Sequence, residues 1–144
     1  MKCFILLASL LLLGIFSTAE AESSKEFKER IGPIAKTCQT EVKATDDDVK
    51  NLLNRNELTT KSAKCLQRCI YKKVGVLKGD KDDLASKEEL MKIWGRVYEG
   101  NESILMKGEP IVEKCLTHVL ANKAADGCDA AAQIQHCVTE NLKA

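Results

Sequence analysis

The sequence predicts an all-α fold, a compact bundle of about six short helices stapled by three disulfides. Three observations support this prediction. No stretch alternates apolar and polar residues over the length of a strand. Apolar stripes with the spacing i, i+3, i+4, i+7 follow residues that cap helices. Six cysteines follow an N-terminal segment with the layout of a secretory signal peptide, and an even number of cysteines in a secreted chain indicates disulfides.

The N-terminal segment is expected to be a signal peptide over residues 1–21. Met1-Lys2 gives a positive start, residues 4–16 form an apolar run, and Ala19-Glu20-Ala21 places small residues at −3 and −1. The apolar run is shorter than the roughly 20 residues that span a bilayer, so it predicts no membrane anchor. We therefore expect one secreted, extracellular domain over residues 22–144. Its formal net charge of +1 without a basic block argues against a nucleic-acid or membrane partner.

The first two expected helices lie before residue 55. Ser24 can cap the first helix, which contains Phe27 and Ile31. Gly32-Pro33 should kink or split that helix, because proline lacks an amide donor and clashes with the preceding turn. Thr45 is the expected cap of the second helix, and the three aspartates that follow it interact favourably with the helix dipole.

The third expected helix begins at Thr59 or Thr60 and ends at Gly75. A polar turn over residues 79–83 follows it. The stripe that this helix should bury consists of Cys65, Leu66, Cys69, Ile70 and Val74.

The last three expected helices follow Ser86, which has capping-box spacing to Glu89. The fourth helix should end near Gly100, and the sequon at Asn101 then falls in a loop, where we expect it to stay unmodified. Pro110 opens the fifth helix and Asp129 caps the sixth. Their apolar stripes are Leu90, Ile93, Trp94 and Val97, then Val112, Cys115, Leu116, Val119 and Leu120, then Ala130, Ile134, Cys137 and Val138.

The cysteines after residue 21 are expected to form disulfides and not a metal site. Cys65 and Cys69 lie one helical turn apart with parallel side chains, which is poor geometry for a mutual bond, so each should link to a different element. Beyond that, the spacing leaves the pairing open. The chain has no CxxC pair, and His118 and His136 do not form a zinc spacing with cysteine pairs.

No catalytic constellation is apparent, so we expect no enzyme and no cofactor. A nucleophile and base would need an oriented histidine, but His118 and His136 lie on separate expected helices with no motif around them. The acidic run from Asp80 resembles a calcium loop, but its twelfth position is Met91 and not glutamate.

The cysteine spacing is specific enough to suggest a family. The gaps between the six cysteines are 26, 3, 45, 12 and 8 residues. A secreted six-helix chain of this size with these spacings resembles an insect odorant-binding protein, of the pheromone-binding and general odorant-binding family, over the whole of residues 22–144. The resemblance implies an apolar cavity among the helices, which for a small ligand measures roughly 300–1,000 Å³. It also implies the pairing Cys38–Cys69, Cys65–Cys128 and Cys115–Cys137.

The resemblance implies a secreted carrier that moves small hydrophobic semiochemicals through aqueous lymph to olfactory receptors. The alternative keeps the fold and changes the role, to a salivary, seminal or defensive carrier or scavenger. With only four aromatic residues after residue 21, we expect an aliphatic lining that suits a fatty alcohol, ester, aldehyde or terpenoid. We expect a monomer or weak homodimer that contacts an olfactory receptor.

The candidate ligand-binding residues come from the apolar stripes. Each of them could instead be ordinary core. Trp94 is expected to face inward, and Tyr98 to offer a hydroxyl at the rim. Only seven residues follow Cys137, too few for a separate plug, and Leu142 should pack against the bundle. The candidates are Leu53, Ile70, Val74, Leu90, Ile93, Trp94, Val97, Tyr98, Leu116, Val119, Leu120, Ile134 and Val138.

Overall fold

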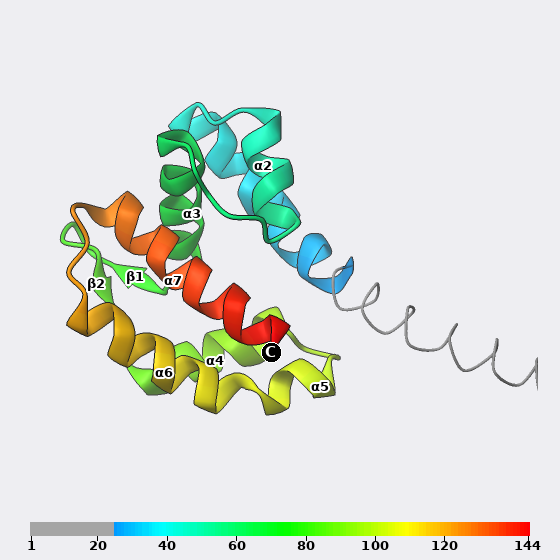
Figure 1. Cartoon of the computed structure of the whole chain (residues 1–144). Helices are drawn as coiled ribbons and strands as arrows, with labels where there is room; N and C mark the ends of the chain where they lie inside the picture. Colours follow the sequence, from blue (N-terminus) through cyan, green and yellow to red (C-terminus); the bar gives the residue numbers. More distant parts are fainter. Residues whose placement is uncertain (1–24) are drawn as a thin grey trace, which may run out of the picture.

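The computed structural model describes residues 25–144, which form seven helices and one short hairpin (Figure 1). The all-α prediction is confirmed, with one helix more than expected. Ser24, the expected first cap, and the signal segment lie outside the described residues. The elements are a first helix over residues 25–42, α2 (Asp46–Leu53), α3 (Lys61–Val74), β1 (Leu77–Lys78), β2 (Asp83–Leu84), α4 (Lys87–Val97), α5 (Glu102–Met106), α6 (Gly108–Ala121) and α7 (Gly127–Lys143).

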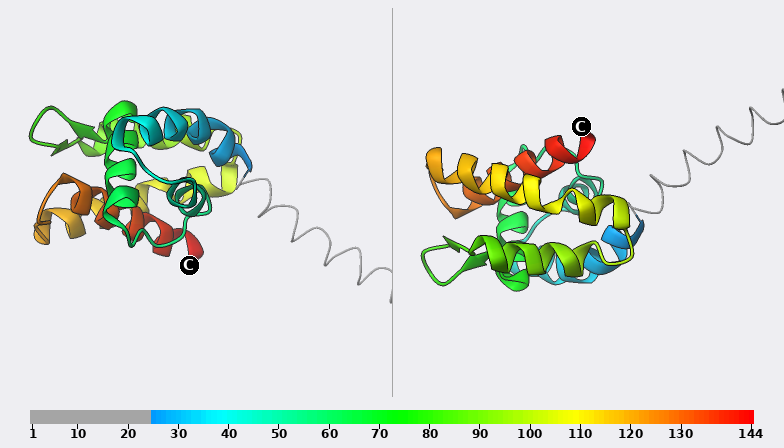
Figure 2. Two further views of the ribbon diagram at one scale, coloured as in Figure 1. Left: turned by 90° about the horizontal axis from the view of Figure 1, so that it is seen from above. Right: turned by 90° about the horizontal axis from the view of Figure 1, so that it is seen from below.

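The helices form two layers joined at one end by α3. Figure 2 shows the first helix and α4 on one side and α6 and α7 on the other, with α3 crossing between them. Three clusters of buried side chains fill the bundle. One joins the first helix to α2 and α3, one joins α4 to α5, α6 and α7, and one joins the hairpin to α4 and α7.

A kink or a split was predicted at Gly32-Pro33, but the first helix is continuous there, so the split is wrong. Pro33 lies on the exposed side of the helix, whereas Ile31, Ala35 and Cys38 lie on the side that packs against α2 and α3. Burial of apolar side chains both before and after the proline stabilises one helix over two, at the cost of one backbone hydrogen bond.

The predicted caps of α2 and α3 are confirmed and are joined through Asp48. Thr45 and Asp48 form a capping box, in which each side chain accepts a hydrogen bond from the backbone N–H of the other. Thr60 caps α3, and its hydroxyl donates to Asp48 Oδ1 at 2.8 Å. Ser62 donates to Asp48 Oδ2 at 2.6 Å. The buried carboxylate of Asp48 therefore holds the start of α2 against the start of α3.

We expect Asp48→Asn to lower the free energy of unfolding by about 2 kcal/mol at pH 7. Burial alone would raise the pKa of Asp48, but the hydrogen bonds from Ser62, Thr45 and Thr60 outweigh burial and lower the pKa from 3.8 to about 2. A lowered pKa stabilises the fold above the unfolded-state pKa, and this stabilisation is lost as the pH falls from about 4 to about 2.

Urea unfolding of Asp48→Asn at several pH values measures this effect, with Asp47→Asn as the control. Asp47 is the exposed neighbour on the same first turn, so its replacement should cost about 0.5 kcal/mol or less. A difference between Asp48→Asn and the wild type that stays constant down to pH 2 would contradict the assigned role.

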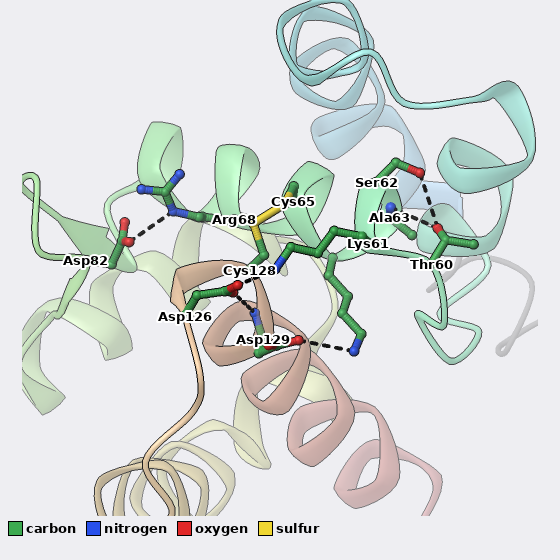
Figure 3. The surroundings of a disulfide bond; sticks show 11 residues. Thr60, Lys61, Ser62, Ala63, Cys65, Arg68, Asp82, Asp126, Cys128 and Asp129 are labelled. Carbon is green, nitrogen blue, oxygen red and sulfur yellow. Dashed lines mark hydrogen bonds and ion pairs between the residues drawn. A yellow bond between two sulfur atoms is a disulfide. The ribbon is translucent and has the colours of Figure 1, made fainter.

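A two-strand hairpin stands where the sequence predicted only a polar turn. Leu77 pairs with Leu84 and Lys78 with Asp83. Strands of two residues are too short to show alternation, so the pattern could not predict them. Arg68 Nε donates to Asp82 Oδ2 at 3.0 Å, and this ion pair ties the hairpin to α3 (Figure 3).

The predicted α4 cap is confirmed, because Ser86 and Glu89 form a capping box. The region after α4 differs from the prediction, which placed Asn101 in a loop. Asn101 instead caps the additional helix α5, and its side-chain oxygen accepts a hydrogen bond from the Ile104 N–H at 3.2 Å. A single turn contains too few apolar positions to show a period.

The last two helices begin earlier than predicted. α6 starts at Gly108 and not at Pro110, which still falls in the first turn, where no amide donor is needed. The cap of α7 is Asp126 and not Asp129. Asp126 Oδ1 accepts a hydrogen bond from the Asp129 N–H at 2.9 Å, and α7 therefore starts at Gly127.

The three disulfides have the pairing that the resemblance implies: Cys38–Cys69, Cys65–Cys128 and Cys115–Cys137. They link the first helix to α3, α3 to α7, and α6 to α7. Around Cys65–Cys128, Lys61 pairs with Asp126 and Lys64 with Asp129 (Figure 3). As expected, Cys65 and Cys69 link one helix to two different elements, so α3 connects both layers.

Candidate ligand-binding site

An apolar cavity of about 140 Å³ lies between the two layers. Its volume is below the range of roughly 300–1,000 Å³ expected for a small-ligand pocket. A long ligand must therefore displace lining side chains or extend beyond the cavity. The lining residues are Phe27, Ile31, Leu52, Arg55, Gln67, Ile70, Tyr71, Val74, Val76, Leu84, Leu90, Ile93, Trp94, Val97, Tyr98, Val112, Cys115, Leu116, Ile134, Gln135, Val138, Thr139 and Leu142.

Most of the candidate residues face this cavity. Leu53, Val119 and Leu120 are absent from the lining. Leu53 packs against the cluster of the first helix, α2 and α3, and Val119 packs beside the hairpin. Leu120 lies in the last turn of α6 and is 70% exposed. The candidates that line the cavity are Ile70, Val74, Leu90, Ile93, Trp94, Val97, Tyr98, Leu116, Ile134 and Val138.

Aromatic side chains contribute more to the lining than the sequence predicted. All four aromatic residues of the described chain line the cavity, so Phe27 and Tyr71 add to the expected Trp94 and Tyr98 and the lining is less aliphatic than expected. The rings of Trp94 and Tyr98 lie 4.6 Å apart, and those of Phe27 and Tyr98 lie 6.3 Å apart. Tyr98 is buried within the lining and not at a solvent-facing rim. The sequence did not indicate Phe27 or Tyr71 as lining residues, although Phe27 was expected in the first helix together with Ile31.

The Trp94 ring is held in place by one hydrogen bond and by close contact with the backbone at the start of α6. Its indole N–H donates to the Ile104 carbonyl at 3.1 Å. Gly108 lies directly against the ring, since a Cβ at that position would stand 2.6 Å from the indole. Glycine at the start of α6 therefore allows the helix to approach α4, which positions the Trp94 ring as a wall of the cavity.

Arg55, Gln135 and Thr139 are polar residues of the lining that lie at one end of the cavity, beside an adjoining recess that they also line. Gln67 and the phenols of Tyr71 and Tyr98 line the cavity alone. Burial raises the pKa of the Tyr98 phenol, while the positive charge of Arg55 opposes that rise. Burial also raises the pKa of the Tyr71 phenol. Both phenols are therefore neutral at physiological pH and can donate hydrogen bonds to a ligand.

A polar recess of about 1,040 Å³ adjoins this end of the cavity. Arg55, Gln135, Thr139 and Leu142 line both spaces. The recess also includes Glu26, residues 54–57, residues 100–104, and the last turns of α7 with His136. Leu142 packs against the cluster of α4, α5, α6 and α7, as expected, and it also lines both the cavity and the recess. A position near the chain end has no long apolar stripe behind it, so the sequence could not indicate this role.

The structure offers little for metal coordination in the described part of the chain. Cys38, Glu41 and Cys69 have ligand atoms close together. Both sulfurs are joined in a disulfide, and a disulfide leaves no thiolate to bind a metal. Across residues 25–144, no helix combines the length and apolarity that crossing a membrane requires.

Short helices cross-linked by three disulfides around an apolar cavity define a class of carrier for small hydrophobic molecules. The particular family follows from comparison with known proteins: residues 20–141 match the model of the PBP/GOBP family, and the chain belongs to this family. The predicted resemblance is therefore confirmed. The family is one of odorant-binding carriers and not of enzymes.

Similar proteins match most of the length of this chain. General odorant-binding protein 19d of Drosophila melanogaster is 29% identical over 96% of this chain and 88% of its own length. A pheromone-binding protein of the cockroach Leucophaea maderae, solved with the fluorescent reporter ANS, is 32% identical with a TM-score of 0.69, over 81% of this chain and 95% of that chain. A fatty acid binding protein, OBP56a, of the blowfly Phormia regina shares the fold, with a TM-score of 0.57 at 20% identity over 81% of this chain and 91% of that chain.

Proposed function

We propose that this protein is a secreted carrier that encloses a small hydrophobic semiochemical and transports it through aqueous lymph. The observation that supports this most is the apolar cavity between the two layers, lined from all the long helices. Removing apolar surface from water stabilises the complex by about 25 cal/mol per Å². The disulfides fix the spacing of the helices around the cavity, and their stabilisation offsets the packing contacts that an unfilled cavity loses. The proposal contains no catalytic step and no cofactor.

A ligand titration tests the proposal. The chain from residue 22 is titrated with dodecan-1-ol in the presence of a neutral fluorescent probe, and displacement should give a micromolar dissociation constant, equivalent to about −8 kcal/mol. Trp94 emission should change on binding because its ring lines the cavity. Absence of both displacement and an emission change would refute the carrier function.

Two leucines on α6 offer a matched pair of variants. Leu116 lines the cavity, whereas Leu120, one turn later, is exposed. Leu116→Phe adds volume to a cavity of only about 140 Å³, so we expect at least about fivefold weaker dodecan-1-ol binding. Leu120→Phe should leave the affinity unchanged. Equal effects of the two variants on affinity would place the ligand outside the cavity.

Delivery to an olfactory receptor is the finer part of the proposal. It requires that the protein occurs in the lymph around olfactory neurons, so we expect transcripts and protein in antennae. Expression confined to salivary or reproductive tissue would instead favour the carrier or scavenger role outside olfaction.

A further inference from the structure

Arg55 is held in an unusual backbone conformation at the boundary of the cavity. It follows the C-terminus of α2, with φ of 57°. Its N–H donates to the Leu52 carbonyl at 3.0 Å, closing the end of the helix. Glycine is the usual residue in this left-handed position, because a Cβ is strained there. Arginine occupies this position although glycine would fit the backbone conformation with less strain. We therefore expect the side chain of Arg55 to have a role.

The guanidinium group of Arg55 is oriented by two aromatic rings, but its buried Nη2 has no hydrogen-bond partner among the described residues. Its Cζ lies 4.6 Å from the ring centroid of Phe27 and 5.4 Å from that of Tyr98. These cation–π contacts orient the group without using its N–H donors. Within residues 25–144, Nη2 is buried and finds no hydrogen-bond acceptor. A buried donor without an acceptor is unfavourable, so the site favours a ligand that brings one.

We infer that Arg55 binds the carboxylate of a long-chain carboxylic acid whose alkyl tail occupies the apolar cavity. This inference rests on the proposed carrier function and makes its ligand class specific. Arg55 lines both the cavity and the polar recess, so it stands where the head of an amphiphile would leave the apolar part. A guanidinium forms short, charge-assisted bonds with a carboxylate, whereas an alcohol or ester offers no negative charge. The predicted ligand class thus shifts from neutral chains toward acids.

Glu26 is one of four glutamates that line the recess with Arg55; the others are Glu57, Glu102 and Glu140. The Oε2 atom of Glu26 is buried without a hydrogen-bond partner among the described residues. A ligand carboxylate would meet repulsion from Glu26, so Glu26→Gln should keep or tighten acid binding. If Arg55 instead served only to neutralise Glu26, removing either charge would change stability without changing the preference between ligands.

The experiment compares dodecanoate with dodecan-1-ol, two ligands with equal chain length. At pH 7.5 the wild type should bind dodecanoate at least about tenfold more tightly, equivalent to about 1.4 kcal/mol. Arg55→Met keeps an unbranched apolar side chain and should remove that preference, while dodecan-1-ol binding stays within about threefold. Arg96→Met is the control, since Arg96 is exposed on α4 and lines neither space.

A second variant shows whether a loss of preference in Arg55→Met comes from misfolding. Arg55→Gly suits the left-handed backbone and also removes the guanidinium, so it should reproduce the loss of dodecanoate preference in a protein with an unchanged circular dichroism spectrum. If the wild type binds both ligands equally, or if Arg55→Met and Arg55→Gly keep the preference, the inference is overturned. If the wild type binds neither ligand, the carrier function itself fails.

Discussion

Replacing Cys65 and Cys128 together with serine is expected to lower the free energy of unfolding by about 4 kcal/mol. The two cysteines are 63 residues apart, the largest separation among the three disulfides. Closing a longer loop removes more entropy from the unfolded chain. This disulfide also joins the two layers through α3 and α7, so its loss should weaken ligand binding by widening the cavity.

Urea unfolding at pH 7 measures this loss, and the Cys115–Cys137 double replacement provides the comparison. Its cysteines are only 22 residues apart and link neighbouring helices α6 and α7, so the expected cost is about 3 kcal/mol. A loss below about 1 kcal/mol for the Cys65–Cys128 replacement would mean that packing and ion pairs alone hold α3 against α7.

Trp94→Ala is expected to destabilise the fold by about 3–5 kcal/mol. The side chain is only 7% exposed, packs against Tyr98, and covers Gly108. Its removal enlarges the cavity and leaves the Ile104 carbonyl without its indole donor. Both effects should lower the midpoint of thermal unfolding, which circular dichroism can follow.

Trp94→Phe separates the ring from the hydrogen bond. It keeps most of the apolar contact but not the N–H donor, so we expect a loss of about 1–2 kcal/mol. Gly108→Ala gives an independent check of the contact with Gly108. It should destabilise the wild type, in which its Cβ meets the indole, and be tolerated in the Trp94→Ala background. Additive effects of the two changes on unfolding free energy would contradict direct packing.

Local signals in the sequence predicted the starts of α2, α3 and α4 correctly. Thr45, Thr60 and Ser86 are caps in the structure as expected. A cap depends on hydrogen bonds between residues three apart, so nearby residues are enough to predict it. α5 and the hairpin were missed because they are too short to show a hydrophobic period.

The candidate site was predictable in part. The stripes on α3, α4 and α7 face the cavity as expected, because helical periodicity identifies the side that faces the interior. Periodicity could not exclude Leu120 from the predicted lining. A residue at the end of a helix is buried only if a neighbouring helix extends far enough to cover it. Periodicity also could not suggest Arg55 or Leu142, whose roles depend on residues distant in sequence.

The sequence by itself determined the fold class, the family and the cysteines to be paired, since these follow from local helix signals and from spacing along the chain. Only the tertiary structure decided that the first helix passes unbroken through Gly32-Pro33, because burial on both sides of the proline outweighs its local penalty. It also decided that Arg55 lies beside Phe27 and Tyr98 at the mouth of the cavity. Such a site forms when the end of α2, the first helix and α4 pack together, and no local pattern contains that information.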